Sequence, residues 1–259
     1  MIKSLSIIFL LGIISLYGCN KDQGQAVKPN PIHKNIFKLE FIDSYVLTGV
    51  KEPSGLSWAM DQQNLIVVDD NSNKAFLINT KGKILKTLPY TGDDTEGVTI
   101  NNHDKTIWIS EEALSQLIQL DSNGNKINTY PINIVRESKK KGLEGLGYSN
   151  KEDVYYIVNE AKPRLLIKWK PSQGIIQKTT LNFSLDCSGI YANTMDKSLW
   201  IVSDESQKLY YCNNQGIVIQ SFDLGFPKAE GIVVDLNNQR VYIVSDSEQK
   251  LYTYKITTL

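Results

Sequence analysis

Histidine is nearly absent from this sequence. The 259 residues contain two, His33 and His103. Neither lies in a recognisable setting with a serine or cysteine, so a Ser-His-Asp hydrolase is not expected. The sequence also lacks a glycine-rich phosphate loop. These absences remove common signatures of catalysis but leave metal-dependent chemistry open.

An excess of charge is also missing, because 28 basic residues balance 28 acidic ones. Proteins that bind the phosphate backbone usually carry a basic excess, so no nucleic-acid partner is expected. No long stretch after the first twenty residues shows the 3.6-residue apolar period of a helix. The bulk of the chain is therefore expected to be β-structure.

Cysteine is rare, and its first occurrence is informative. Lys3 precedes an apolar run, Ser4–Tyr17, which is too short and wrongly flanked for a membrane span. The run ends in Gly18 and Cys19, and this order resembles the bacterial lipobox, in which cleavage precedes a lipidated cysteine. Residues 1–18 are therefore predicted to be a lipoprotein signal peptide. The alternative is an ordinary secretory signal followed by an incidental cysteine.

Residues 19–36 are polar, contain two prolines and show no periodicity, so they are predicted to be a lipidated tether. The protein is then expected in the bacterial cell envelope, anchored in the outer membrane and facing the periplasm or the surface. Cys187 and Cys212 could pair in an exported protein. Because spacing alone does not bring them together, two buried free thiols are favoured.

A repeat organises the rest of the chain. From Phe37 onward, strand-like runs alternate with turn residues, and a glycine followed by an apolar residue recurs at steps of 42, 48, 44 and 42 residues. These glycines are Gly55, Gly97, Gly145, Gly189 and Gly231. The residues before them are Ser54, Glu96, Glu144, Ser188 and Glu230. Sixteen positions after the pre-glycine residue, every copy has an acid: Asp70, Glu112, Glu160, Asp204 and Asp246.

A period of 42 to 48 residues with about four strands is typical of a β-propeller blade. The fifth repeat ends after its third strand, and the N-terminal run Phe37–Leu47 has no blade of its own. That run can supply the missing strand and remove the open edge. The sequence therefore predicts an all-β, five-bladed β-propeller over residues 37–259.

The repeat also predicts a site. In a propeller, the start of the first strand and the end of the second lie on one face around the axis. Glu96, Glu144 and Glu230, with Ser54 and Ser188, should form an inner ring with the five acids close by. Carboxylates so crowded raise one another's pKa unless a positive charge compensates.

Oxygen ligands with almost no histidine suit a hard cation, so calcium is the expected cofactor. Glu96, Glu144, Glu230, Glu160 and Asp204 are the candidate ligands. The remaining candidates on this face are Ser54, Ser188, Asp70, Glu112 and Asp246. The alternative for the five acids at the strand ends is structural, because such residues often accept hydrogen bonds from turn amides.

The second repeat has six extra residues near Val135–Lys140. Lys139 and Lys140 within it are candidates for an anion contact or a lid beside the site, since this loop reaches the same face. A solvated loop is the alternative.

The glycine motifs, the run Tyr156–Arg164 and the lipoprotein start resemble the SdiA-regulated family of bacterial propeller proteins, which is distantly similar to NHL-repeat propellers. The resemblance covers roughly residues 37–259. It implies a five-bladed fold with a bound calcium and no established reaction. Glu144 and Glu160 lie in the best-matching stretch.

Two functions remain open. The first is a lipid-anchored, calcium-binding propeller, expected to be monomeric, that binds an unknown protein or small molecule. The second is a metal-dependent hydrolase of an ester, lactone or phosphoester, with the metal at the channel mouth and Glu160 or Asp204 as the proton acceptor.

Overall fold

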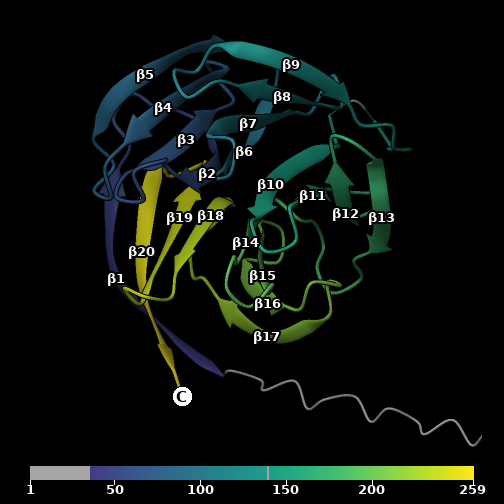
Figure 1. Ribbon diagram of the computed structural model, residues 1–259. Helices are drawn as coiled ribbons and strands as arrows, with labels where there is room; N and C mark the ends of the chain where they lie inside the picture. Colours follow the sequence, from purple (N-terminus) through teal and green to yellow (C-terminus); the bar gives the residue numbers. More distant parts are fainter. Residues whose placement is uncertain (1–35, 139) are drawn as a thin grey trace, which may run out of the picture. The chain divides into compact units, whose positions relative to one another are not determined.

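The computed structural model describes residues 36–138 and 140–259. Its strands form five antiparallel sheets of four strands each, and the sheets follow one another around a common axis (Figure 1). The prediction of a five-bladed propeller is confirmed. The part of the chain described here holds no helix long and apolar enough to cross a bilayer. The predicted signal peptide and tether, with Cys19, lie outside the described residues.

Each blade runs from the axis to the rim. The innermost strands are β2 (Pro53–Trp58), β6 (Thr95–Asn101), β10 (Leu143–Ser149), β14 (Gly189–Ala192) and β18 (Ala229–Asp235). The second strands are β3 (Leu65–Asp69), β7 (Thr106–Glu111), β11 (Val154–Asn159), β15 (Leu199–Ser203) and β19 (Arg240–Ser245). The third strands are β4 (Lys74–Ile78), β8 (Gln116–Leu120), β12 (Leu165–Lys170), β16 (Lys208–Cys212) and β20 (Lys250–Thr258). The outer strands are β5 (Ile84–Thr91), β9 (Lys126–Pro131), β13 (Gly174–Thr180), β17 (Val218–Asp223) and β1 (Phe37–Val46).

The two ends of the domain share the last blade, as the sequence predicts. Its strand order is β1-β20-β19-β18, and β1 pairs antiparallel with β20 along its length. The amide of Leu259 also donates to the carbonyl of Ile36 at 2.8 Å. The N-terminal strand therefore covers the edge that β20 would otherwise expose.

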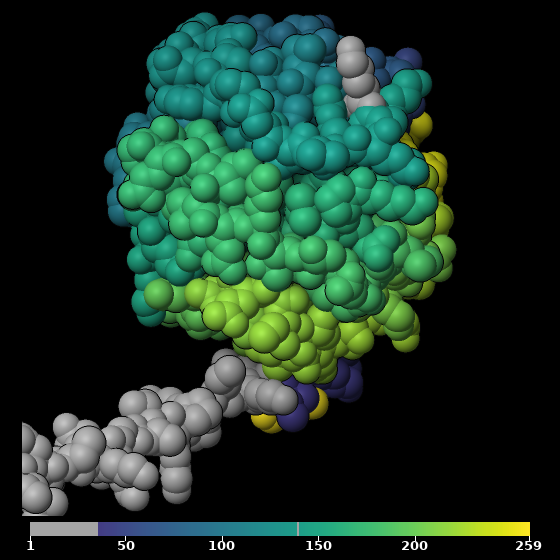
Figure 2. Space-filling view, turned by 90° about the vertical axis from the view of Figure 1, so that its right-hand side faces the viewer, coloured from purple at the N-terminus to yellow at the C-terminus, as the bar shows by residue number. Residues whose placement is uncertain are grey.

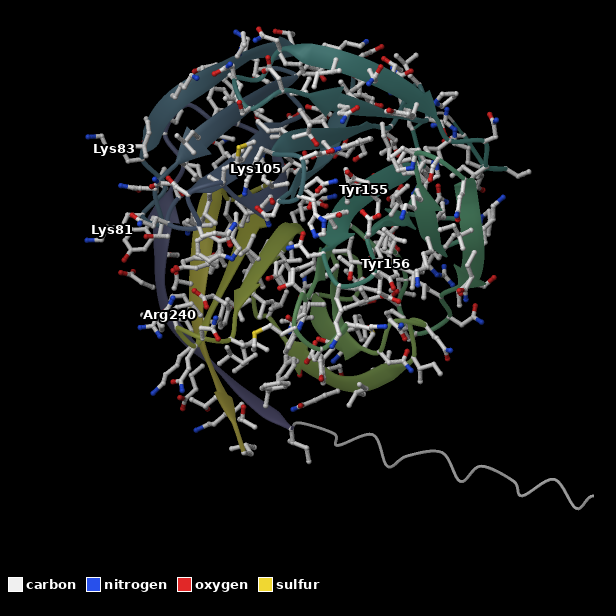
Figure 3. All side chains as sticks on the ribbon, in the orientation of Figure 1. Lys81, Lys83, Lys105, Tyr155, Tyr156 and Arg240 are labelled. Atoms are coloured by element: carbon white, nitrogen blue, oxygen red, sulfur yellow. The ribbon has the colours of Figure 1, made fainter. Side chains whose placement is uncertain are left out.

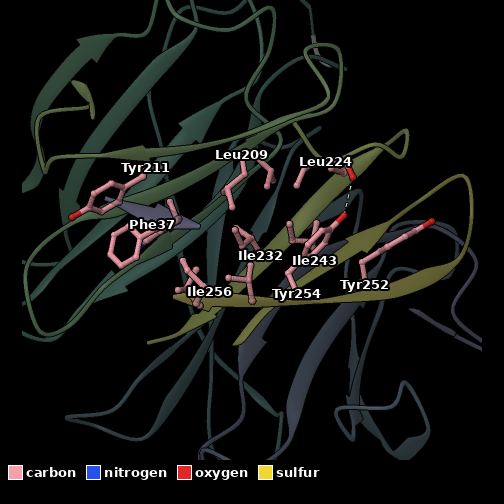
Figure 4. Close-up of a cluster of buried hydrophobic side chains, with 14 of the residues drawn as sticks. Phe37, Leu209, Tyr211, Leu224, Ile232, Ile243, Tyr252, Tyr254 and Ile256 are labelled. Carbon is pink, nitrogen blue, oxygen red and sulfur yellow. Dashed lines mark hydrogen bonds between the residues drawn. The ribbon is translucent and has the colours of Figure 1, made fainter. Parts of the chain in front are cut away.

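The hydrophobic core lies between neighbouring blades. Tyr155 and Tyr156 are consecutive on β11, so they point to opposite faces of the sheet and enter two different clusters (Figure 3). Between the last two blades, Phe37, Tyr211, Ile243 and their neighbours pack together (Figure 4). On the face shown in Figure 2, adjacent blades meet without an open gap. Lys81 and Lys83, in the turn before outer strand β5, lie at the rim and point away from the ring (Figure 3).

The five motif glycines allow the inner strands to meet. An added Cβ on Gly189 would lie 1.9 Å from the carbonyl oxygen of Glu230 on the next blade, and one on Gly97 would lie 2.4 Å from the carbonyl oxygen of Glu144. Real Cβ atoms do not approach backbone so closely. Glycine is required there by close approach of backbones, as the motif suggested.

The residue after each motif glycine closes the axis. These five side chains are aliphatic and 1–4% exposed: Leu56, Val98, Leu146, Ile190 and Ile232. Together they line a cavity of only about 10 Å³. The axis is therefore filled by an apolar plug, defined here as these five residues, and the two mouths of the propeller are separated.

Candidate metal centre

A β-bulge turns the pre-glycine residues toward one mouth. In four blades the register between the first and second strands shifts by one residue across the motif, for example between Thr95 and Val98. Two residues of β6 then face one of β7 there, and the extra residue leaves the ladder. Glu96 lies in this shift, and Glu144 lies in the corresponding one between Leu143 and Leu146. The sequence motif is thus the signature of a bulge that aims a carboxylate.

The mouth encloses a cavity of about 140 Å³. Nine of the predicted site residues line it: Ser54, Asp70, Glu96, Glu144, Glu160, Ser188, Asp204, Glu230 and Asp246. Glu112 does not line the cavity, but it lies beside Glu96 and Glu144. The structure therefore brings the two predicted sets of residues together around one opening, where the inner strands begin.

Two groups of carboxylates converge enough to hold a metal ion. Glu96, Glu112 and Glu144 each offer an oxygen within 4.8 Å of the other two. Asp70, Asp94 and Glu96 form a second group by the same measure. Glu96 belongs to both groups, so it occupies the centre of the acidic wall formed by the first three blades.

Sequence reasoning missed a further row of residues. Glu52, Asp94, Asp186 and Lys228 each stand two positions before a pre-glycine residue, and three of them line the cavity. Side chains two residues apart in an extended strand share a face. Counting back two positions from each pre-glycine residue would therefore have found this row in the sequence.

The acids at the strand ends have unequal surroundings. Asp204 accepts from the Lys228 amide at 2.9 Å and lies 2.7 Å from its Nζ. Glu112 accepts from the Gly142 amide. These hydrogen bonds run to the loop that enters the next blade. Within the described residues, neither of these two carboxylates accepts a hydrogen bond from an amide of its own turn.

In two blades the residue before the acid holds the loop that enters the first strand of the same blade. Asp69 accepts from the amides of Lys51 and Glu52 at 2.9 and 2.7 Å. Glu111 accepts from the Asp93 amide at 3.0 Å. Because neighbouring residues point to opposite sides, one carboxylate secures the loop while the next faces the mouth.

Positive charge compensates only part of the ring. Lys141 lies 3.5 Å from Glu160, and Lys228 pairs with Asp204. Lys141 closes the inserted segment that contains the predicted Lys140, which is exposed, and Lys139, which lies outside the described residues. Within residues 36–138 and 140–259, no lysine forms an ion pair with Asp70, Asp94, Glu96, Glu112 or Glu144. The guanidinium of Arg136 lies beside this group and donates to the backbone carbonyls of Glu112 and Ala113.

Enclosure and repulsion raise the pKa of these acids. Burial, followed by neighbouring carboxylates, raises the pKa of Glu96 and Glu144 well above the usual range. Burial and the charges of Asp94 and Glu52 raise the pKa of Asp70 to about 6. Burial and the charge of Asp94 raise the pKa of Glu112 to about 7, although its bond from Gly142 acts in the opposite direction. An ionised ring is therefore costly without a counter-ion.

A pH dependence of stability follows. An acid whose pKa is higher in the folded state holds its proton in that state where the unfolded chain has lost it. Its contribution to stability is full below the unfolded pKa and is lost as pH rises through the folded pKa. Without metal, the unfolding free energy should fall by roughly 2 kcal/mol between pH 4.5 and 7.5, after allowance for solvent screening.

Thermal unfolding in chelator across this pH range measures the effect. A Glu112→Gln variant removes one of the titrating groups, so its melting temperature should depend less on pH. Surface acids such as Asp153, whose pKa is lowered by its bond to Lys170, are ionised through most of this window and serve as the reference. A melting temperature that rises steadily from pH 4.5 to 7.5 contradicts the prediction.

Known proteins share the fold of this chain, and one family model matches its sequence. The family model described as SdiA-regulated matches residues 32–255. A comparison with curated protein sequences returns no match. A solved glutaminyl cyclase from Myxococcus xanthus is similar at a TM-score of 0.67 and 11% identity, over 85% of this chain and 97% of that one.

Two other enzymes share the fold. A gluconolactonase from Xanthomonas campestris has a TM-score of 0.57 and 11% identity, over 85% of this chain and 95% of that one. A luciferin-regenerating enzyme has a TM-score of 0.53 and 13% identity, over 86% and 96%. At such identities the likeness is one of fold.

Proposed function

This chain belongs to the SdiA-regulated family, and from that premise we propose that it is an exported, lipid-anchored propeller that binds calcium at its acidic mouth. It acts there as a binding module for a protein or a small molecule. The anchor is Cys19, the location is the bacterial cell envelope, the working form is a monomer, and no nucleic acid takes part. Replacing Cys19 with alanine should release the protein from the membrane fraction; unchanged recovery there would contradict the anchor.

One observation carries the calcium proposal, namely the convergence of two groups of carboxylates on Glu96. Calcium takes six to eight oxygens at about 2.3–2.6 Å, so two ligands on opposite sides of the ion are about 4.8 Å apart. The oxygens of Glu96, Glu112 and Glu144 all lie within 4.8 Å of one another. The donor set is therefore of the right chemistry and spacing.

We assign the ligands by their surroundings. Glu96 and Glu144 are the central pair, with Glu112 and Asp70 beside them and Glu230 across the mouth. Glu160 and Asp204 already face a lysine, so their part in the proposal is an outer one. Ser54, Ser188 and Asp246 complete the lining and can hold water around the ion.

Calcium should raise the stability of the protein. A cation present at 100 times its dissociation constant adds roughly 2.7 kcal/mol. For a domain of this size that corresponds to about 5–10 °C in melting temperature. Differential scanning calorimetry with calcium and with chelator measures the shift, and isothermal titration gives the stoichiometry. An unchanged melting temperature together with no heat of binding would remove the calcium proposal.

The Glu144→Gln variant is a more specific test, because it should raise the stability of the calcium-free protein and lower its affinity for calcium. Without calcium the variant should be more stable than the wild type at pH 7, since one of the mutually repelling charges is gone. With calcium it should bind about 100-fold more weakly, a loss of roughly 3 kcal/mol. Glu40→Gln on outer strand β1 is the matched control and should change neither quantity.

A hydrolase is the second candidate. A divalent cation at this mouth would polarise a substrate oxygen, and Glu160 or Asp204, which line the same cavity, would accept the proton. The fold it shares with a gluconolactonase favours a lactone among the substrates. Calcium-dependent turnover of an ester, lactone or phosphoester that disappears in Glu144→Gln would favour the enzyme; silence across the panel favours the binding module.

A further inference from the structure

The mouth opposite the acids is also hollow. Strands β2, β6, β10, β14 and β18 all run from the acidic mouth to this end, where their turns surround two adjoining cavities of about 90 and 220 Å³. The cavities share Trp58, Gln62, Tyr191 and Thr194. Both exceed the roughly 10–15 Å³ that a water molecule needs. We call this region the aromatic mouth.

Aromatic side chains form one wall of the aromatic mouth. Trp58 ends β2 and Tyr191 lies on β14, and both are half-buried while packing on the same hydrophobic cluster. Trp58 meets Tyr242 edge-on, with ring centroids 5.7 Å apart. Tyr242 therefore fixes the orientation of the Trp58 indole, and part of the indole surface stays accessible. An aromatic ring that is fixed and partly exposed can stack against the apolar face of a ligand.

Amides form the other wall. The turn of each of the five blades contributes one: Gln62, Asn102, Asn150, Asn193 and Asn237. An amide side chain both donates and accepts hydrogen bonds. The Oδ1 atom of Asn150 is buried and has no partner among the described residues. A buried acceptor without a partner is costly and points to a group that completes it.

Charge is nearly missing from the aromatic mouth. Among the described residues that line the two cavities, Asp235 is the one charged side chain, and Asn238 binds it through both its backbone and its side chain at 2.9 and 2.7 Å. The described lining itself offers no cation to a phosphate or carboxylate ligand, and the Lys151 ammonium at its edge donates to the carbonyl of Met195 at 3.2 Å. The lining suits a neutral ligand with many hydroxyl or amide groups.

From this lining we infer a second binding site, which takes a neutral saccharide. A sugar ring presents an apolar face of C–H groups to an aromatic side chain and a rim of hydroxyls to amides, and both partners are present here. The apolar plug separates this site from the acidic mouth, so the inference does not depend on the metal.

Titration with neutral sugars tests the site. The probes are glucose, N-acetylglucosamine, cellobiose and N,N′-diacetylchitobiose, observed by saturation-transfer NMR and by tryptophan fluorescence on the full chain. At least one probe should bind and alter the fluorescence of Trp58. Trp58→Leu should weaken that binding at least tenfold. Asn237→Ala, in an exposed turn where folding is not at risk, should weaken it several-fold.

Two controls separate this site from the first. Glu144→Gln should leave sugar binding unchanged, and Trp58→Leu should leave calcium binding unchanged. The absence of binding by all four probes overturns the inference. Binding that survives both Trp58→Leu and Asn237→Ala also overturns it, because the sugar would then sit elsewhere.

Discussion

A chain that begins at residue 48 is expected to lose its cooperative fold, although it keeps every strand from β2 to β20. The lost segment, β1, is the outer strand of the last blade and pairs with β20 along its length. Without it, β20 presents nine residues of unpaired edge to solvent. An exposed edge of that length favours pairing with another chain, so aggregation is expected.

The N-terminal strand also joins the last two blades. Phe37 is 3% exposed and packs against Trp200 and Tyr211, with ring centroids 5.3 and 5.1 Å apart. The side chain of Gln220 accepts from its amide at 2.9 Å and donates to its carbonyl at 2.7 Å. Removing β1 therefore opens a cavity beside Trp200, and loss of one buried aromatic side chain alone costs about 3–5 kcal/mol.

Circular dichroism and analytical size exclusion measure the result. The matched control is a chain that begins at Lys34, the start of the compact unit, which retains β1 and should melt as the full chain does. A truncated chain from residue 48 that remains monomeric and melts in a single sharp transition would show that closure by β1 is dispensable.

Replacement of Gly189 by alanine is expected to cost about 3–5 kcal/mol, at the upper end for overpacking. The new Cβ would lie 1.9 Å from the carbonyl oxygen of Glu230. That oxygen belongs to the backbone of the next inner strand, so a rotamer change cannot relieve the contact. Two blades must separate instead, and Glu230 must move with its strand.

Gly174→Ala is the control for this substitution. Gly174 has a φ of +74° and nothing within 4 Å of an added Cβ, so the cost there is the left-handed backbone alone, about 1–2 kcal/mol. Denaturant unfolding compares the two variants. Gly189→Ala should also bind calcium more weakly if Glu230 contributes to the site, whereas Gly174→Ala should not. Equal destabilisation of both variants would contradict a ring held by close backbone contact.

Much of the fold could be predicted because the repeat is local. Each blade is a run of antiparallel neighbours, so the position of Gly97 relative to Glu112 fixes one hairpin regardless of the other blades. Spacing and turn residues were therefore enough to assign the strands. The one difference at the acidic mouth is that each second strand ends one residue before the acid, and not at the acid itself. Closure of the ring could be predicted in the same way. The last repeat lacks its fourth strand, and the strand that begins at residue 37 belongs to no repeat.

The sequence also determined which mouth is acidic, because strand direction places Glu96, Glu144 and Glu230 at the same end as the five acids. The sequence did not determine which further side chains join these carboxylates at the mouth. Asp94 joins the carboxylates around Glu96 because two-residue alternation continues into the loop before β6. The sequence allows the alternation to be counted back from Glu96 to Asp94. Whether the backbone stays extended over those two residues depends on how the loop leaves the preceding blade, which the sequence does not fix.

Only the tertiary structure decided which carboxylates find a partner across the boundary between two blades. Asp204 pairs there with the charge of Lys228, and Glu112 accepts a hydrogen bond from the amide of Gly142. The geometry of such contacts is set by how closely neighbouring sheets pack, which in turn depends on the glycines at the axis. The aromatic mouth depends on packing in the same way, since Trp58 and Tyr191 come from blades far apart in the sequence and share a wall only because the ring is closed.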